Sequence, residues 1–98
     1  MEKTINYKYN EDQLLYELKE YIDSTYNEHY AQAKTQTSEF IIQNGLGIGF
    51  TVGNIIKYAQ RYGKKEGRNR KDIMKVLHYA IMMLYTHDYD MKETNETK

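Results

Sequence analysis

The chain has no cysteine, no proline and no tryptophan among its 98 residues. Without cysteine it can form neither disulfides nor thiolate metal sites. Its first residues, MEKTINYKYNEDQ, lack the apolar core of a signal peptide. No apolar run approaches the roughly 20 residues that span a membrane. These absences predict a soluble, cytoplasmic protein that has no membrane partner.

Tyrosine supplies much of the apolar content that is present. There are 11 Tyr residues, and 40% of the chain is apolar overall. Residues 1–98 are expected to form a single domain, near the size at which one core becomes self-sufficient. A core that depends on Tyr leaves hydroxyls at its edge, and self-association adds buried surface to a small core. We therefore expect a homo-oligomer.

The net charge is zero, but the charges are distributed unevenly. Residues 1–30 carry seven acidic residues against three lysines, whereas residues 54–85 carry eight Lys or Arg against two acidic residues. A basic centre between acidic ends favours a local anion site over a nucleic-acid coat. We do not expect nucleic acid as a partner.

The helical spacing of apolar residues, together with the absence of proline, predicts an all-α fold. A first helix is expected from Glu11 to about residue 28, capped by Asn10, within the acidic segment 1–28. A short second helix is expected from a cap at Thr37 or Ser38 to Asn44. The following GLGIG is expected to be a flexible connection, two of whose glycines can adopt positive φ.

The C-terminal half predicts an antiparallel αα-hairpin. One helix is expected from about Phe50 to Tyr62, where Gly63 ends it, and Asn69 is expected to cap a second helix from Arg70 to about residue 87. Residues 88–98 are expected to be a frayed tail. The last helix has the most regular apolar spacing in the chain, through Ile73, Val76, Leu77, Ala80, Ile81 and Leu84.

Five of the six glycines cluster in GLGIGFTVGNIIKYAQRYG. This stretch does not match the dinucleotide fingerprint G-x-G-x-x-G, because Phe50 and Val52 stand where the third glycine belongs. It does not match a P-loop, because Lys65 replaces Ser or Thr. Two interpretations remain open. Gly49 and Gly53 let a neighbouring helix approach closely, or the loop amides and the first helical turn face an anion.

A polar row lies on the first helix of the predicted hairpin. Asn54, Lys57 and Arg61 are spaced i, i+3 and i+7, and Lys64 follows at the end of the helix. Arg offers a planar fork to phosphate, Lys offers a mobile point charge, and Asn can orient a ligand. These four residues are candidate phosphate-binding residues.

A second row, Asp72, Lys75 and Tyr79, has the same spacing on the next helix. If the hairpin closes, the two rows border one groove, in which Lys75 binds phosphate, Asp72 fixes a basic side chain, and Tyr58 or Tyr79 stacks on a base. The alternative is a solvated face on which Asp72 pairs with the basic residues.

The histidines predict no metal site. His78 and His87 are nine residues apart and lack metal-ligand spacing. His29, followed by Tyr30, is either a base with an aromatic neighbour or a surface residue. The sequence contains neither a nucleophile triad nor a carboxylate pair, so it identifies no catalytic residue, and we expect no cofactor.

The HY at 29–30 and the stretch GIGFTVGNIIKYAQRYGKKEGRNRKDIMKVLHYA at 47–80 resemble a small bacteriophage family of unknown function. Members of that family are often labelled nucleotide kinase, because the domain is similar to part of a short-tailed coliphage enzyme that phosphorylates deoxynucleoside monophosphates without a Walker motif. The resemblance covers roughly residues 29–85, and it implies that residues 1–28 form an acidic N-terminal helical extension outside the family core. This chain departs from the family pattern at His78-Tyr79, where Trp-Tyr is usual.

The resemblance implies a phage-encoded protein in the cytoplasm of the infected bacterium, with a family-like core over residues 29–87. It implies binding of a nucleotide or other phosphorylated small molecule, with kinase-like phosphoryl transfer. The alternative is a non-enzymatic inhibitor of a host protein or defence system, including one that sequesters a signalling nucleotide. The positions that match the family pattern are His29, Tyr30, Asn54, Lys57, Arg61, Lys64, Asp72 and Lys75.

Overall fold

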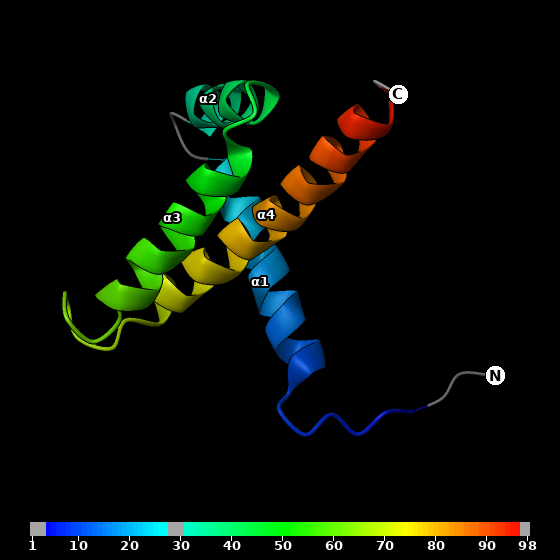
Figure 1. Ribbon diagram of the computed structural model, residues 1–98. Coiled ribbons are helices and arrows are strands. Elements are labelled where there is room, and N and C mark those ends of the chain that lie inside the picture. The colour runs from blue at the N-terminus through cyan, green and yellow to red at the C-terminus, as the bar shows by residue number, and fades with distance from the viewer. Residues whose placement is uncertain (1–3, 28–30, 97–98) are drawn as a thin grey trace.

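The computed structural model describes residues 4–27 and 31–96 as an assembly of α-helices (Figure 1). No strand occurs in these described residues, which confirms the all-α prediction. None of the described helices is both long and apolar enough to cross a membrane. The helices are α1 (Glu11–Tyr26), α2 (Ala31–Gln43), α3 (Gly47–Arg61) and α4 (Arg70–Glu96).

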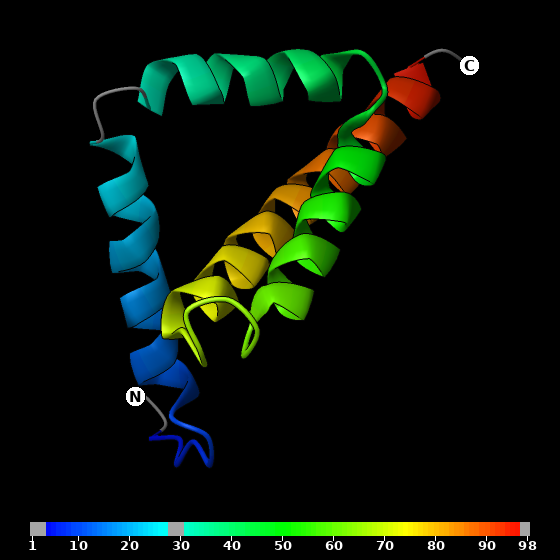
Figure 2. The ribbon, with the colours of Figure 1, turned by 90° about the vertical axis from the view of Figure 1, so that its left-hand side faces the viewer.

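Helices α3 and α4 lie side by side and run in opposite directions, joined by residues 62–69 (Figure 1). Helices α1 and α2 lie on one side of this pair, so that α1, α2 and the α3–α4 pair outline an open triangle (Figure 2). Helix α1 is tied to α4 by an ion pair between Arg70 Nη2 and Glu17 Oε1 at 2.6 Å. The opposite side of the α3–α4 pair is covered by no other described helix.

The start of α1 is fixed by backbone contacts. Asn10 occupies the N-cap, as expected, but its φ of 56° is left-handed and its side chain makes no cap hydrogen bond. Its carbonyl accepts from Leu14 N at 2.8 Å, while Glu11 Oε1 accepts from Tyr9 N at 3.0 Å. The expected position of the cap was therefore right, but Glu11 supplies the side-chain contact.

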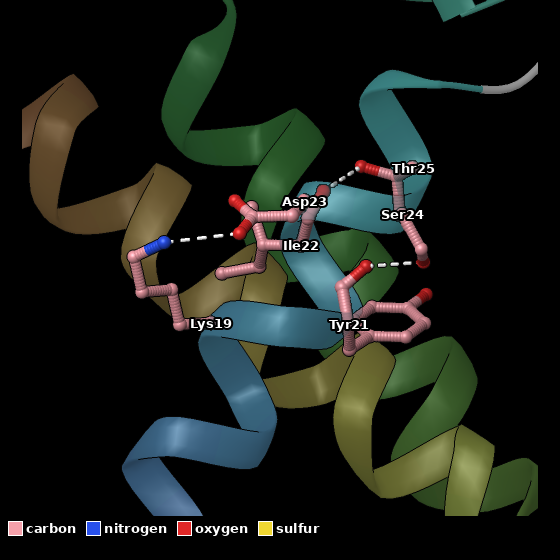
Figure 3. A network of polar contacts seen from close by, with 6 residues as sticks. All are labelled: Lys19, Tyr21, Ile22, Asp23, Ser24 and Thr25. Atoms are coloured by element: carbon pink, nitrogen blue, oxygen red, sulfur yellow. Dashed lines mark hydrogen bonds and ion pairs between the residues drawn. The ribbon is translucent and has the colours of Figure 1, made fainter.

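The end of α1 is fixed by hydroxyl groups (Figure 3). Ser24 Oγ donates to the Tyr21 carbonyl at 2.6 Å, and Thr25 Oγ1 donates to the Ile22 carbonyl at 2.7 Å. These bonds use carbonyl oxygens in the last turns, and the helix ends at Tyr26. An exposed i, i+4 ion pair between Lys19 and Asp23 lies one turn earlier.

Helix α2 begins earlier than predicted. Thr37 and Ser38 do not cap it but lie inside it, where their hydroxyls donate to the carbonyls of Ala33 and Lys34 at 3.0 Å. Polar residues can continue an exposed helix when they bond to the preceding turn in this way, so their polarity was not a boundary signal. The end of the helix was predicted correctly, because Gly45 follows it with a φ of +79°.

The GLGIG segment is mostly helical rather than a flexible connection. Helix α3 begins at Gly47, and among the three glycines of this segment only Gly45 has a positive φ. A Cβ on Gly47 would lie 2.6 Å from Thr86 Cγ2, so this glycine permits α3 to contact α4 closely. The predicted roles of Gly49 and Gly53 were wrong, because both point into open space with no atom within 4 Å of a built Cβ.

Helix α4 begins where the sequence predicted and extends further. Asn69 Oδ1 accepts from Lys71 N at 2.9 Å, which confirms Asn69 as the cap. The helix continues to Glu96, so the prediction of a frayed tail from residue 88 was wrong. Thr86 is fully buried just before the predicted end, and the rings of Tyr85 and Tyr89 stack across it at 6.5 Å.

The apolar core is small. Among the described residues its buried hydrophobic side chains are Leu18, Ile42 and Met74. Thr51 and Thr86 are fully buried, and their hydroxyls donate to carbonyls of their own helices. The two helices are in tight contact at the Gly47 end of α3, and the candidate site lies at the opposite end of the α3–α4 pair, which is more open and polar.

Candidate functional site

Five basic residues form what we call the cationic cluster, at the end of the α3–α4 pair where the connecting loop lies. Four of them, with Gln60, line a shallow and open depression of about 350 Å³. The fifth comes from the second turn of α4 and approaches the same tyrosine ring as two of the others. The members of the cluster are Lys57, Arg61, Lys64, Lys65 and Lys75.

The ring of Tyr58 is at the centre of this cluster. Lys57 Nζ lies 5.1 Å from the ring centroid, Arg61 Cζ lies 5.7 Å away and Lys75 Nζ lies 5.3 Å away. A cation within about 6 Å of an aromatic face is attracted by the ring quadrupole. The ring therefore draws three positive charges from two helices toward one another.

A buried carboxylate orients one of these cations. Asp72, in the first turn of α4, has only 5% of its side-chain surface exposed, and its Oδ1 lies 3.7 Å from Arg61 Nε. Because Asp72 faces Nε, the two terminal nitrogens of Arg61 can serve another acceptor. The second oxygen of Asp72, Oδ2, is buried and has no hydrogen-bond partner in the described structure.

The positive charges of the cluster are not balanced by acidic side chains. Within the part of the chain that the structure describes, Arg61 with Asp72 is the one ion pair that includes a member of the cluster. Lys57, Lys64 and Lys75 have no carboxylate within ion-pair distance there. The cluster thus keeps a local positive excess, as an anion-binding site requires.

Aromatic side chains continue from the cluster toward α1. Tyr58 stacks on Tyr79 with centroids 6.1 Å apart and an 11° angle between planes, and Phe50 meets Tyr79 edge-on at 5.9 Å. His78 meets Tyr21 of α1 edge-on at 6.0 Å. This series of rings connects the hairpin to the inner side of the triangle.

A cavity of about 540 Å³ lies between α1, α2 and α4, with Tyr58 of α3 at its edge. We call it the tyrosine cavity, because five tyrosines line it. Lys75 lines the cavity and is a member of the cationic cluster. Tyr58 also lines the cavity, and the cluster surrounds its ring, so the two sites are adjacent. Its tyrosines are Tyr21, Tyr26, Tyr58, Tyr79 and Tyr85.

Two groups in the cavity wall have perturbed pKa values. Burial lowers the pKa of His78, and the nearby charges of Lys34 and Lys75 lower it further. Burial, with a smaller contribution from Tyr58, raises the pKa of Tyr79. Near neutral pH the wall therefore presents a neutral imidazole and a protonated phenol, which can both donate and accept hydrogen bonds.

The structure brings together most, but not all, of the predicted site residues. Lys57, Arg61 and Lys75 surround one ring, and Lys64 lines the adjoining depression. Asn54 Nδ2 instead donates to the Phe50 carbonyl at 2.9 Å, so a bond within α3 uses its amide.

Two further predicted features are not among the described residues of the cluster. His29 and Tyr30 fall outside the described residues. The first turn of α3, which the sequence offered as a second anion site, is the end of that helix farther from the cluster, and Gly47 is packed there against Ile42 and Thr86.

Sequence reasoning missed the contribution of α1 and α2. Tyr21 and Tyr26 line the cavity, although they belong to the segment that was treated as an acidic extension. Lys34 and Tyr85 line the same cavity from α2 and from the second half of α4. Nothing in their local pattern predicts this, because it depends on the angle at which α1 and α2 fold back toward α4.

Comparison with known proteins identifies the family of the chain. A family model described as a protein of unknown function, DUF3310, matches residues 24–81, which is more than half of the chain. The chain belongs to this family. The matched residues contain the entire cationic cluster and both Tyr58 and Tyr79. Neither a curated protein nor a solved structure matches the chain.

Proposed function

We propose that the protein binds a nucleotide or a similar phosphorylated small molecule, with the phosphate at the cationic cluster. The observation that carries this proposal is the grouping of Lys57, Arg61 and Lys75 around Tyr58, with Asp72 as the one acidic partner among the described residues. A phosphate monoester carries about −1.5 to −2 charges near pH 7 and would neutralise the excess. Arg61 would bind it with the nitrogens that Asp72 leaves available.

The adjacent tyrosine cavity supports a ligand with an aromatic part. Its volume of about 540 Å³ lies within the usual range for small-molecule sites, about 300–1,000 Å³. Tyrosine rings can stack on a base, and their hydroxyls can bond to its polar edge. Lys75 lies between the two compartments, so a nucleotide can place its phosphate in the cluster and its base in the cavity.

The resemblance to phage proteins labelled nucleotide kinase extends the proposal to phosphoryl transfer in the cytoplasm of an infected bacterium. Such transfer depends mainly on positioning and on neutralising the charge of the phosphoryl oxygens, which basic side chains can do without a Walker motif. In this role Lys57, Arg61 and Lys64 hold phosphate groups, and Asp72 positions Arg61. Incubation with ATP and each deoxynucleoside monophosphate, followed by chromatography, tests whether the corresponding deoxynucleoside diphosphate forms together with ADP.

Calorimetric titration tests binding itself. We expect deoxynucleoside monophosphates to bind the wild-type chain and Arg61→Ala to weaken binding about 10- to 100-fold, because a hydrogen bond to a charged group contributes about 1.5–3 kcal/mol. Lys92→Ala, which removes a lysine far along α4, is the matched control. Absence of nucleotide binding, or equal affinities for the Arg61 and Lys92 variants, would refute the proposal.

A second candidate function is binding without turnover, as in a phage inhibitor that sequesters a signalling nucleotide or binds a host protein. It is favoured by the engagement of Asp72 with Arg61, which leaves the cluster without a free carboxylate base among the described residues. A nucleotide that co-purifies unchanged, and is not converted when ATP is added, would support sequestration. A host protein captured in stoichiometric amount would support direct inhibition.

A further inference from the structure

The single chain exposes more surface than a compact protein of its size. Its accessible surface is 8145 Å², whereas a compact monomer of 11.7 kDa exposes about 5,900 Å². Its radius of gyration is 16.1 Å, against about 12.6 Å for a compact chain of this length. The excess surface, about 2,200 Å² per chain, is within the range that permanent homodimers bury, about 1,000–2,500 Å² on each subunit.

A continuous row of exposed residues on α4 is part of this excess. We call it the outer stripe, and its members are spaced alternately by four and three residues, the heptad spacing of helices that pair with other helices. All six are exposed, Leu84 by 64%, and none is Lys, Arg, Asp or Glu. The stripe runs for about 27 Å along the helix. It consists of Ile73, Leu77, Ala80, Leu84, His87 and Met91.

The contacts of α4 show which way the outer stripe faces. Positions 72, 79 and 86 face α3, where they meet Arg61, Tyr58 and Gly47. His78, one residue before Tyr79, contacts α1. Positions 73, 80 and 87 follow the α3-facing positions by one residue, so they are rotated by about 100° in the opposite sense, away from α1.

Helix α3 adds further apolar residues beside this stripe. Because α3 and α4 are antiparallel, residues that follow the α4-facing positions of α3 lie on the same side of the pair as the outer stripe. Ile48 and Ala59 are two such residues, and both are exposed. This side is the one that neither α1 nor α2 covers (Figures 1 and 2).

We propose that two copies of the chain pair through the outer stripe of α4 and the flanking residues of α3. A second copy fits because a two-fold pairing buries the same stripe on both subunits, so that each subunit covers the exposed apolar side chains of the other. Because the single chain buries few apolar side chains, burial of the stripe between two copies would add to the stability of the folded protein. The tyrosine cavity and the cationic cluster beside it lie on the other side of the α3–α4 pair, so the pairing does not depend on the proposed ligand.

Sedimentation of the purified full chain tests the pairing. We expect the wild type to sediment at micromolar concentration with at least twice the mass of one chain, and the double variant Leu77→Glu, Leu84→Glu to lose this association. Leu15→Glu is the matched control, because Leu15 is 65% exposed on α1 and lies outside the stripe. A monomeric wild type, or equal loss of association in the control, would overturn the proposal.

Cross-linking decides the question even if the double variant does not fold. The native chain has no cysteine, so a single introduced thiol reports on one position. Ala80→Cys, in the middle of the stripe, should give a covalent dimer with a short bis-maleimide, whereas Gln36→Cys, exposed on α2, should remain a monomer. Cross-linking at residue 36 but not at residue 80 would place the interface elsewhere and refute the assignment.

Discussion

The glycine at the start of α3 gives a sharp test of how α3 packs on α4. In Gly47→Ala the new Cβ would lie 2.6 Å from Thr86 Cγ2 and 3.0 Å from Ile42 Cγ1. Both neighbours are themselves buried, so neither can move far. Overpacking of this kind costs about 1–3 kcal/mol, which exceeds the gain of up to about 1 kcal/mol from replacing a helical Gly by Ala.

The control lies in the same helix. Gly53→Ala places its Cβ in open space, so only the gain in helix propensity remains, and the free energy of unfolding should rise by about 0.5–1 kcal/mol. The two substitutions are therefore expected to have opposite signs. Urea denaturation followed by circular dichroism at one fixed protein concentration measures both, because the concentration affects the stability of an oligomer.

A second-site change tests the cause. Thr86→Ser removes Cγ2, the closest atom to the added Cβ, and keeps the hydroxyl that donates to the Met82 carbonyl. In a Thr86→Ser background, Gly47→Ala should therefore cost less than in the wild type. If Gly47→Ala is as stable as Gly53→Ala, or if Thr86→Ser gives no relief, the close contact at Gly47 is not the reason for the glycine.

Two further predictions concern the site. Asp72→Asn keeps the side-chain volume but removes the charge that faces Arg61, so the free energy of unfolding should fall by about 1–3 kcal/mol; urea denaturation checks this, and the exposed Asp88→Asn should be nearly neutral. His78 has a pKa below its ordinary value, chiefly because of burial, so the unfolded chain binds more protons than the folded chain as the pH falls through about 6.5. Its contribution to stability should be complete above that pH and should decrease below it, and His78→Gln should flatten the fall of the urea midpoint between about pH 7 and pH 5; an unchanged profile would contradict the burial of the imidazole.

Much of the helical structure could be predicted from sequence, because local patterns determine it. Apolar spacing located α1, α3 and α4, Asn69 supplied the cap of α4, and Gly45 ended α2. The failures have physical causes. Thr37 looked like a boundary because isolated hydroxyl residues favour caps, but its bond to the preceding turn lets the helix continue. The end of α4 was predicted too early because residues 88–96 are mostly polar, whereas the helix continues through them and Tyr89 stacks on Tyr85.

The candidate site could likewise be predicted only in part from the sequence. Helical spacing brought Lys57 and Arg61 to one side of α3, and the antiparallel arrangement brought Lys75 of α4 to the same tyrosine ring. The tyrosine cavity was not predictable, since Tyr21 and Tyr26 reach it only through the path of α1. Asn54 was predicted to orient a ligand because it shares a helical row with Lys57 and Arg61, yet its amide donates to the Phe50 carbonyl in the preceding turn of its own helix.

A crystal structure of the chain with a bound deoxynucleoside monophosphate would show whether the cationic cluster is the phosphate site. We expect phosphate oxygens within hydrogen-bond distance of the Arg61 terminal nitrogens and of Lys57 or Lys75, with the base in the tyrosine cavity. A nucleotide whose phosphate lies on another surface, with Arg61 and the lysines around Tyr58 making no contact to it, would refute the proposed binding site.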